Sequence, residues 1–276
     1  MKYIFGNTTI DLNARPVIMG VLNVTPDSFS DGGQFLSAED ARRRIDDMVA
    51  EGVDIIDVGG ESTRPGAAPV GLDEELRRTI PVIGMIAREH PTIPISIDTT
   101  KSHVAARALD AGATIVNDIS AGIADPAMIP LCGARKASMA LMHMQGTPRT
   151  MQRNPEYLDV VAEVSAFLAA RAEAARSAGV TQIMLDVGIG FGKTLEHNLA
   201  LLRHLNTFHA LGYPLLLGVS RKAFIGKLLG DVPVDARVFG TAGAVSAGVL
   251  AGAQVLRVHD VKAMREAATI AFALRP

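Results

Sequence analysis

The sequence predicts an α/β protein, a (β/α)8 barrel that follows a short N-terminal β-hairpin. Short apolar runs alternate with longer amphipathic runs along the chain. About eight such pairs occur, which is the number that a closed parallel barrel needs. The apolar runs also lack a strict alternation of apolar and polar residues, as strands buried on both faces do. An open doubly wound sheet produces the same pattern and is the alternative.

The individual elements follow in order. Residues 3–12 read as a hairpin with Gly6-Asn7 at its turn, placed to cover the bottom of the barrel. We expect strands at 16–23, 53–60, 93–100, 113–120, 137–144, 181–188, 213–220 and 253–260. The segments 37–52, 72–90 and 156–179 have apolar residues three and four positions apart and predict helices. Ser37 is the expected N-cap of the first one.

Composition limits the class of protein. The 276 residues predict one domain over 1–276, and 48% hydrophobic with 20% charged residues excludes intrinsic disorder. The formal charge of −2 argues against nucleic-acid and membrane-surface partners. The single cysteine, Cys132, excludes a disulfide framework. No signal peptide is evident, and the weakly polar run 242–256 is too short to span a membrane, so we expect a soluble, cytoplasmic protein.

Polar residues stand at the end of almost every predicted strand. They are Asn23, Asp57, Asp98, Asn117, Asp118, His143, Asp186, Ser220, Lys222, Arg257 and His259. Each one alone is more often a helix cap or turn residue than a ligand-binding group. In a barrel, however, all these ends meet at one rim, where substrates bind. Because the ring carries both signs of charge, it predicts a substrate with a donor-rich part and an anionic part.

Three glycine-rich loops have two interpretations each. Segment 188–194 fails the spacing of a P-loop and of a dinucleotide site, so it is a turn against a flat ligand or a plain connection. Segment 58–71 is a movable lid with Arg64 as anion clamp, or a solvated connector. Segment 23–35 closes over substrate through Phe29, or Phe29 packs on the core. Zinc motifs and a serine nucleophile elbow are absent from the sequence.

Eight segments in order resemble the dihydropteroate synthase family of the folate pathway. They are 19–33, 57–66, 96–101, 117–120, 141–152, 186–194, 218–226 and 257–261, and they span nearly the whole chain. Two positions depart from the family pattern. Val187 stands where the family commonly has proline, and the loop is expected to be less stiff because valine does not fix φ. Ala121 stands between Ser120 and Gly122, where the family often has glycine directly after the serine.

The resemblance implies a reaction in which 6-hydroxymethyl-7,8-dihydropterin diphosphate and p-aminobenzoate give 7,8-dihydropteroate and diphosphate. It also implies a Mg²⁺ cofactor, a homodimer and a target of sulfonamide drugs. By motif, the pterin site would be Asp98, Asn117, Asp186 and Lys222, and the diphosphate site Thr63, Arg64, Arg257 and His259. The p-aminobenzoate site would be Thr63, Pro65, Phe191, Ser220 and Lys222, with Phe29 and Asp31 in loop closure and Asn23 as the metal ligand. Arg64, Lys222, Arg257 and His259 would be catalytic.

Two other functions stay open at this point. A pterin-binding methyltransferase module would pass a methyl group to a corrinoid protein, and a non-catalytic pterin-binding protein could share the fold. Arg64, Arg257 and His259 together favour the synthase, because a methyltransferase needs no diphosphate site. For the synthase we expect a dissociative substitution without a covalent enzyme intermediate, in which loops 23–35 and 58–71 exclude water.

Overall fold

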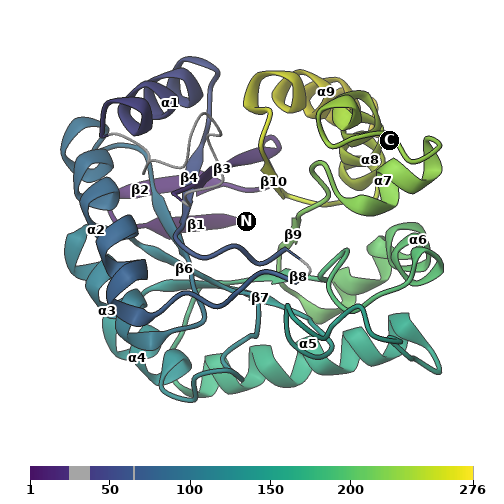
Figure 1. Cartoon of the computed structure of the whole chain (residues 1–276), viewed down its shortest axis with the longest axis horizontal. Coiled ribbons are helices and arrows are strands. Elements are labelled where there is room, and N and C mark those ends of the chain that lie inside the picture. Colours follow the sequence, from purple (N-terminus) through teal and green to yellow (C-terminus); the bar gives the residue numbers. More distant parts are fainter. Residues whose placement is uncertain (25–37, 65, 276) are drawn as a thin grey trace.

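The computed structural model describes residues 1–24, 38–64 and 66–275, and its centre is a closed barrel of parallel strands (Figure 1). The strands are β3 (Val17–Asn23), β4 (Ile55–Gly59), β5 (Ile95–Asp98), β6 (Ile115–Asp118), β7 (Ser138–Met142), β8 (Ile183–Asp186), β9 (Leu215–Leu217) and β10 (Val255–Val258). They pair in chain order, and β10 closes the ring against β3. This confirms the barrel and rules out the open sheet. Each strand is shorter than its apolar run, because the runs include residues of the flanking turns.

Helices surround the barrel (Figure 1). They are α1 (Ala38–Ala50), α2 (Leu72–Glu89), α3 (Ser102–Ala111), α4 (Met128–Arg135), α5 (Val160–Ser177), α6 (Leu195–Arg203), α7 (Ala223–Leu228), α8 (Val238–Leu250) and α9 (Val261–Ala273), with 3-10 turns η2 (Leu205–Leu211) and η3 (Asp235–Arg237). The three helices expected from the sequence correspond to α1, α2 and α5. The expected cap Ser37 lies outside the described residues.

Local sequence signals explain several helix ends. Asp159 caps α5, because its side chain accepts hydrogen bonds from the backbone N–H groups of Val161 and Ala162. Thr194 and His197 form a capping box at the start of α6. Gly112 ends α3 with a φ of 117°, a conformation that glycine adopts without a Cβ clash. These caps fix where the connecting loops leave the helices.

The bottom of the barrel is closed by a two-stranded hairpin, as the sequence predicts. Strands β1 (Lys2–Phe5) and β2 (Thr8–Asp11) place Tyr3, Phe5 and the following Leu12 against the first residues of the barrel strands. The Tyr3 hydroxyl donates a hydrogen bond to the carbonyl of Ile183, 2.8 Å away. The barrel interior is therefore apolar and packed at this end, which leaves the opposite end for polar groups.

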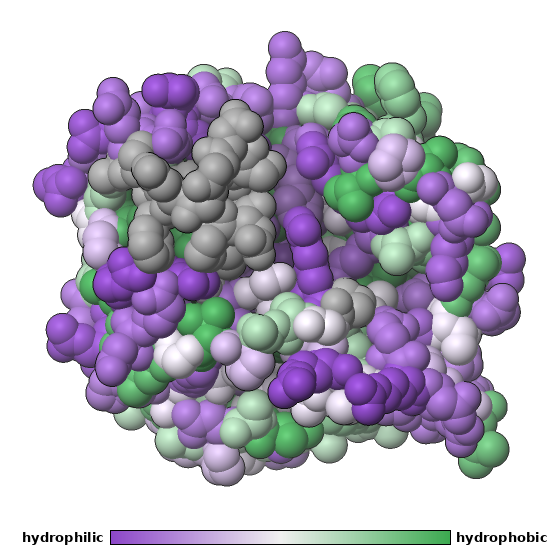
Figure 2. Space-filling view, in the orientation of Figure 1, coloured by the Kyte–Doolittle hydropathy of each residue, from purple (hydrophilic) through white to green (hydrophobic). Residues whose placement is uncertain are grey.

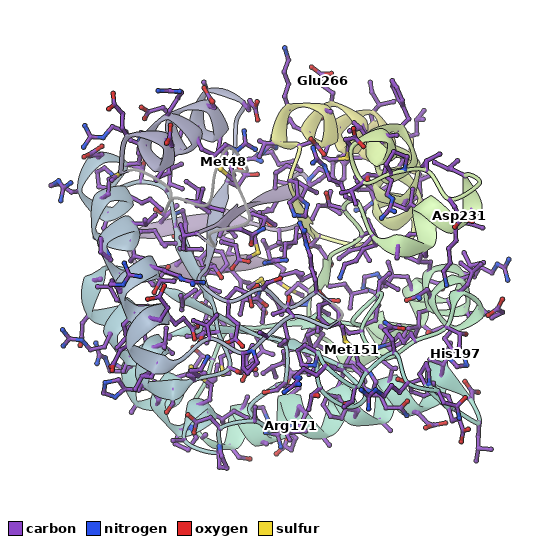
Figure 3. All side chains as sticks on the ribbon, viewed as in Figure 1. Met48, Met151, Arg171, His197, Asp231 and Glu266 are labelled. Carbon is purple, nitrogen blue, oxygen red and sulfur yellow. The ribbon has the colours of Figure 1, made fainter. Side chains whose placement is uncertain are left out.

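Side chains divide between the core and the surface as the sequence pattern predicts. Met48 of α1 is buried between helix and sheet, whereas Asp231 and Glu266 point outward from the edge of the molecule (Figure 3). Among the described residues, no helix is long and apolar enough to cross a membrane. The single cysteine, Cys132, is buried, and burial raises the pKa of its thiol to about 12.

Truncation of the hairpin plug tests the role of the barrel bottom. We expect Phe5→Ala to lower the free energy of unfolding by about 3–5 kcal/mol, because it leaves a cavity in a packed core. Ile4→Ala, on the exposed face of the same strand, should change it by less than about 0.5 kcal/mol. Thermal and denaturant unfolding measure both values, and equal losses in the two variants would contradict this view of the plug.

Candidate active site

Two buried carboxylates share one guanidinium at the carboxyl ends of the strands. Arg257 of β10 donates from Nε to Asp57 Oδ2 of β4, and from Nη2 to Asp98 Oδ2 of β5, both at 2.6 Å. Asn117 of β6 donates from Nδ2 to the same Asp57 oxygen at 3.2 Å. In the sheet register, Asn117 lies beside Asp98. Side chains from four strands therefore meet inside one mouth.

This cluster carries excess negative charge. The pKa of Asp98 is raised to about 7, because burial and the charge of Asp57 outweigh the opposing charge of Arg257. Although burial disfavours the charged guanidinium, the two carboxylates hold the pKa of Arg257 above its usual value. Asp57 Oδ1 is buried and has no hydrogen-bond partner among the described residues. The mouth therefore suits a ligand that donates hydrogen bonds.

Asp186 and Lys222 lie on the other side of the same mouth. Asp186 ends β8, and its Oδ1 accepts a 2.7 Å hydrogen bond from the backbone N–H of Gly188. A Cβ built on Gly218 would lie 3.5 Å from Asp186 Oδ2 and 4.0 Å from Arg257 Cβ. Asp186 and Arg257 therefore flank one point. The polar side chains at the strand ends lie together at one rim, as a barrel predicts. Burial raises the pKa of Asp186 and lowers that of Lys222 to about 8.

The Lys222 ammonium sits over an aromatic face. Its Nζ lies 4.0 Å from the centre of the Phe191 ring, which itself is buried. A Cβ on Gly190 would lie only 3.2 Å from Lys222 Cδ, so the lysine stem packs on the backbone of the 188–192 turn. The close approach of the lysine stem requires glycine at this position of the turn.

His259 and Ser220 form a second polar pair at the mouth. Ser220 Oγ lies 3.0 Å from His259 Nδ1 and accepts a hydrogen bond from the His259 backbone N–H at 3.1 Å. Burial, together with the positive charges of Arg257, Arg221 and Arg64, lowers the pKa of His259 to about 3. The imidazole is therefore neutral at pH 7. The exposed Arg64 lies close enough to His259 for its charge to act on the imidazole.

The predicted metal ligand lies at the end of β3. A Cβ on Gly59 would lie 3.6 Å from Asn23 Oδ1 and 3.7 Å from Asp98 Oδ2, so both oxygens approach one point. In the described part of the chain, no group of three or more His, Cys, Asp or Glu side chains is arranged to hold a metal ion. The loop-closure residues Phe29 and Asp31, and Pro65, lie outside the described residues.

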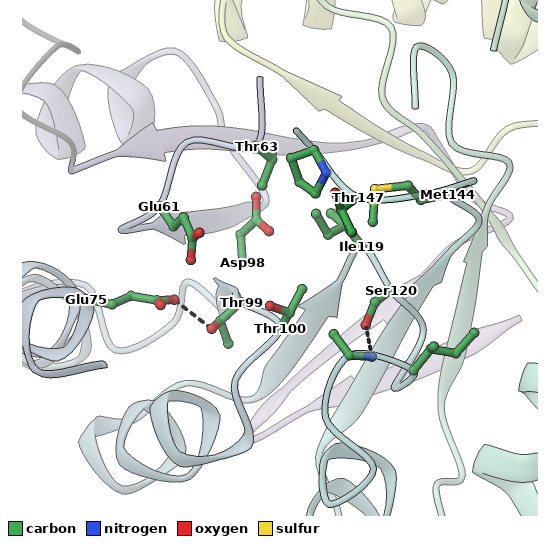
Figure 4. Close-up of a pocket in the computed structure, with 14 residues that line it drawn as sticks. Glu61, Thr63, Glu75, Asp98, Thr99, Thr100, Ile119, Ser120, Met144 and Thr147 are labelled. Atoms are coloured by element: carbon green, nitrogen blue, oxygen red, sulfur yellow. Dashed lines mark hydrogen bonds between the residues drawn. The ribbon is translucent and has the colours of Figure 1, made fainter. Parts of the chain in front are cut away.

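A cavity of about 240 Å³ adjoins Asp98 (Figure 4). It is lined by Glu61, Thr63, Glu75, Asp98, Thr99, Thr100, Ile119, Ser120, Ile123, Ala124, Met144, Gly146, Thr147 and Pro148. Thr99 Oγ1 donates to Glu75 Oε1 at 2.6 Å, and Lys101 binds both Glu75 and Glu61. The backbone N–H of Gly66 donates to the Pro148 carbonyl, which joins the loop after β4 to the loop after β7.

Some polar residues of the site were not expected from the sequence in their present role. Asp57 was expected among the polar residues at the strand ends, but the sequence did not indicate its partner. The Glu61–Lys101–Glu75 cluster was not expected. Lys193 follows the glycines of the 188–192 turn, in a segment whose spacing does not match a phosphate loop, and the sequence assigns it no role. The sequence feature that could have indicated this buried lysine is its position between a glycine-rich turn and the start of a helix.

Comparisons with known proteins agree with this geometry. The family model described as pterin binding enzyme matches residues 19–259. The chain is 48% identical to the dihydropteroate synthase of Synechocystis over 98% of this chain and 93% of that protein. The crystal structure of Yersinia pestis dihydropteroate synthase with a sulfonamide drug superposes with a TM-score of 0.93, at 41% identity and 99% and 98% coverage.

A second solved structure shows the same likeness. The Xanthomonas albilineans dihydropteroate synthase, determined with 4-aminobenzoic acid, has a TM-score of 0.92 and 41% identity, and covers 100% of this chain and 99% of its own. The likeness spans the barrel, the hairpin and the strand ends at which the acidic and basic side chains meet. The chain therefore belongs to the dihydropteroate synthase family of pterin-binding enzymes.

Proposed function

We propose that this chain joins 6-hydroxymethyl-7,8-dihydropterin diphosphate to p-aminobenzoate and releases diphosphate and 7,8-dihydropteroate. The observation that carries the proposal is the meeting of Asp98, Asn117 and Asp186 with Arg257 at one mouth. Related structures support the choice of ligands. A Thermus thermophilus relative at 43% identity was solved with 6HMPPP, and a Clostridium difficile relative at 45% with pteroic acid.

The acids of the mouth recognise the pterin. A dihydropterin presents amino and ring N–H donors on one edge, and a carboxylate accepts two such donors in parallel. Asp98 and Asp186 supply the carboxylates, and the Asn117 amide supplies a further polar contact. All three are at least nine-tenths buried, so an unmatched ligand would leave the remaining polar atoms of these side chains unpaired in a dry site.

The bases of the mouth stabilise the leaving group. The bond from the pterin methylene carbon to the diphosphate oxygen breaks, and its electron pair leaves with diphosphate. Arg257 uses two N–H groups on Asp57 and Asp98, which leaves others to donate to the departing anion. Thr63, Arg64 and neutral His259 complete the diphosphate contacts in this proposal. These donors act on charge that develops in the transition state.

The arylamine then captures the pterinylmethyl cation. Its nitrogen forms the new C–N bond and loses a proton to solvent. Because an arylamine is already neutral at pH 7, the step needs no strong general base. The Phe191 face, Ser220 and the Lys222 stem form the p-aminobenzoate side of the mouth. We propose that no covalent enzyme intermediate forms. Lys222 lies close to the reacting groups without bonding to them covalently.

The side-chain oxygen at the end of β3 suits Mg²⁺. Magnesium prefers few protein oxygens and fills its remaining positions with water and substrate phosphate oxygens. Asn23 Oδ1 would hold the ion, whereas Asp98 Oδ2 stays bonded to Arg257. When bound, the ion would neutralise charge on the diphosphate. Asn23 itself would orient the ion toward the diphosphate end of the substrate.

The methyltransferase alternative is not favoured by the relatives, which are dihydropteroate synthases over nearly the full length of this chain. A direct assay decides between the two. Purified protein with dihydropterin diphosphate, Mg²⁺ and p-aminobenzoate should form dihydropteroate and diphosphate in equal amounts. Chromatography measures the dihydropteroate, and a diphosphate assay measures the leaving group. Methyl transfer to a corrinoid protein without diphosphate release would overturn the proposal, and a stable pterin–enzyme adduct would overturn the mechanism.

The pH dependence follows from two buried groups. Asp98 must be ionised to accept the pterin donors, and its pKa of about 7 predicts that kcat/KM falls as the pH drops below that value. Lys222 must stay protonated in the site, and its pKa of about 8 predicts that kcat/KM also falls as the pH rises above that value. A plot of kcat/KM against pH from 5 to 10 should therefore be bell-shaped.

The control for this series is a matched pair of variants. Asp98→Asn should remove the acidic limb along with much of the pterin affinity, whereas Asp231→Asn at an exposed position should leave the profile unchanged. A profile that is flat between pH 6 and 9 in the unsubstituted protein would contradict the assignment of the two limbs.

We also propose that the chain forms a homodimer through α8 and α9. Large apolar side chains are exposed there: Phe239 (89%), Leu250 (50%), Ile270 (65%) and Leu274 (70%). The space-filling view has hydrophobic surface over the α7–α9 side of the molecule (Figure 2). Exposed apolar patches of this kind mark interaction sites. The two helices pack on each other, so they present one continuous surface to a second copy.

Sedimentation tests the dimer. The unsubstituted protein should sediment as a dimer at micromolar concentration, and Phe239→Glu should sediment as a monomer because a charge cannot be buried at the centre of an apolar interface. Leu158→Glu, at a fully exposed apolar residue before α5, should leave the dimer intact. A monomeric unsubstituted protein, or a dimer in the Phe239→Glu variant, would overturn the proposed interface.

A further inference from the structure

Lys193 is buried in the protein, and the reaction proposed above makes no use of it. Its side chain is only 2% exposed although it carries an ammonium group. Burial lowers its pKa to about 7, while the charge of Asp186 opposes that shift. A lysine is rarely buried to this extent without a specific set of partners. Its position just after the 188–192 turn makes those partners informative.

Three acceptors surround the Lys193 amine. Its Nζ lies 2.9 Å from the Phe191 carbonyl, 3.3 Å from the His143 carbonyl and 3.0 Å from His143 Nδ1. Burial and the lysine charge lower the pKa of His143 to about 3, so the imidazole is neutral and its Nδ1 accepts. An ammonium has three N–H donors, and each one has an acceptor here. The group is therefore built into the fold rather than aimed at solvent.

These bonds join two loops of the mouth. His143 directly follows β7, and Phe191 lies in the loop after β8. A Cβ on Gly188 would lie 1.9 Å from the His143 carbonyl oxygen, and one on Gly192 would lie 2.4 Å from that of Gln145. The two backbones are therefore in direct contact, and only glycine permits this approach. Lys193 binds the carbonyl groups on both sides of the contact.

The same turn carries the groups that face the substrates. The Gly188 N–H holds one oxygen of Asp186, and the Phe191 ring lies under the Lys222 ammonium. The three acceptors of Lys193 all belong to these two loops, and none of them takes part in the proposed reaction. Its hydrogen bonds therefore act on the reaction through the turn, while its charge also acts on Asp186.

We propose that Lys193 is a positioning residue, which fixes the 188–192 turn so that Asp186 and Phe191 face their substrates. The inference rests on the proposed function for the identity of those substrates. Lys193→Met keeps an unbranched side chain as far as Cε and removes all three donors, while it also removes the cost of burying a charge. The fold should therefore survive, and the turn should lose its attachment to the β7 loop.

Steady-state kinetics of Lys193→Met give the first test. We expect KM for p-aminobenzoate and for dihydropterin diphosphate to rise about tenfold, with kcat changed by less than about threefold, because misplaced contacts weaken substrate binding. A loss of folded protein alone would lower kcat and leave KM unchanged. Lys193→Gln, which retains N–H donors, should restore part of the affinity. Lys2→Met, at an exposed position on β1, is the matched control and should change neither constant.

Hydrogen exchange gives a second test that does not depend on turnover. The peptide covering 186–192 should exchange faster in Lys193→Met, because the Gly188 and Phe191 N–H groups are hydrogen-bonded only while the turn holds its shape. The hairpin peptide should exchange as before. Unchanged KM values or unchanged exchange in folded Lys193→Met would overturn the role of Lys193. Absence of dihydropteroate with the unsubstituted protein would overturn the proposed function alone, and exchange would still decide the role of Lys193.

Discussion

One guanidinium compensates two buried carboxylates at the mouth of this barrel, and the rest of the site depends on that arrangement. Arg257 reaches from β10 to Asp57 on β4 and Asp98 on β5. Without it, two negative charges would stand together in a water-poor interior, and removal of one partner from such a buried cluster typically costs about 3–5 kcal/mol. The shared arginine leaves the cluster short of donors. In the proposed function a donor-rich heterocycle completes the cluster, while the unused guanidinium N–H groups donate to the diphosphate.

The barrel separates stability from chemistry along its axis. At the bottom, the hairpin residues Tyr3 and Phe5 close an apolar layer with the strand beginnings. At the top, the strand ends carry carboxylates, amides and cations. Because parallel strands all point the same way, a residue type placed at the end of each strand reaches one rim whatever its distance along the chain. The apolar bottom can therefore hold the strands in place while the top tolerates buried charge.

The sequence predicts the barrel well for a physical reason. Strands buried on both faces are apolar throughout, and glycine and capping residues mark the intervening helices, so the alternation is visible without a structure. The sequence also predicts that Asp98, Asn117, Asp186 and Arg257 gather at one mouth. It does not predict that Arg257 pairs with Asp57, 200 residues earlier, because this depends on how the barrel closes. Lys193 was missed for a similar reason, since its acceptors are backbone carbonyls, which leave no trace in side-chain patterns.

The measurement that tests the central claim most directly is a comparison of Arg257→Lys with the unsubstituted protein. Lysine keeps the positive charge but cannot bind two carboxylates and an anion through one planar group. Calorimetric titration with dihydropterin diphosphate should show weaker binding, and kcat should fall by about 10²-fold or more. The exposed Arg203→Lys variant should match the unsubstituted protein in both. Unchanged affinity and unchanged kcat in Arg257→Lys would contradict the account.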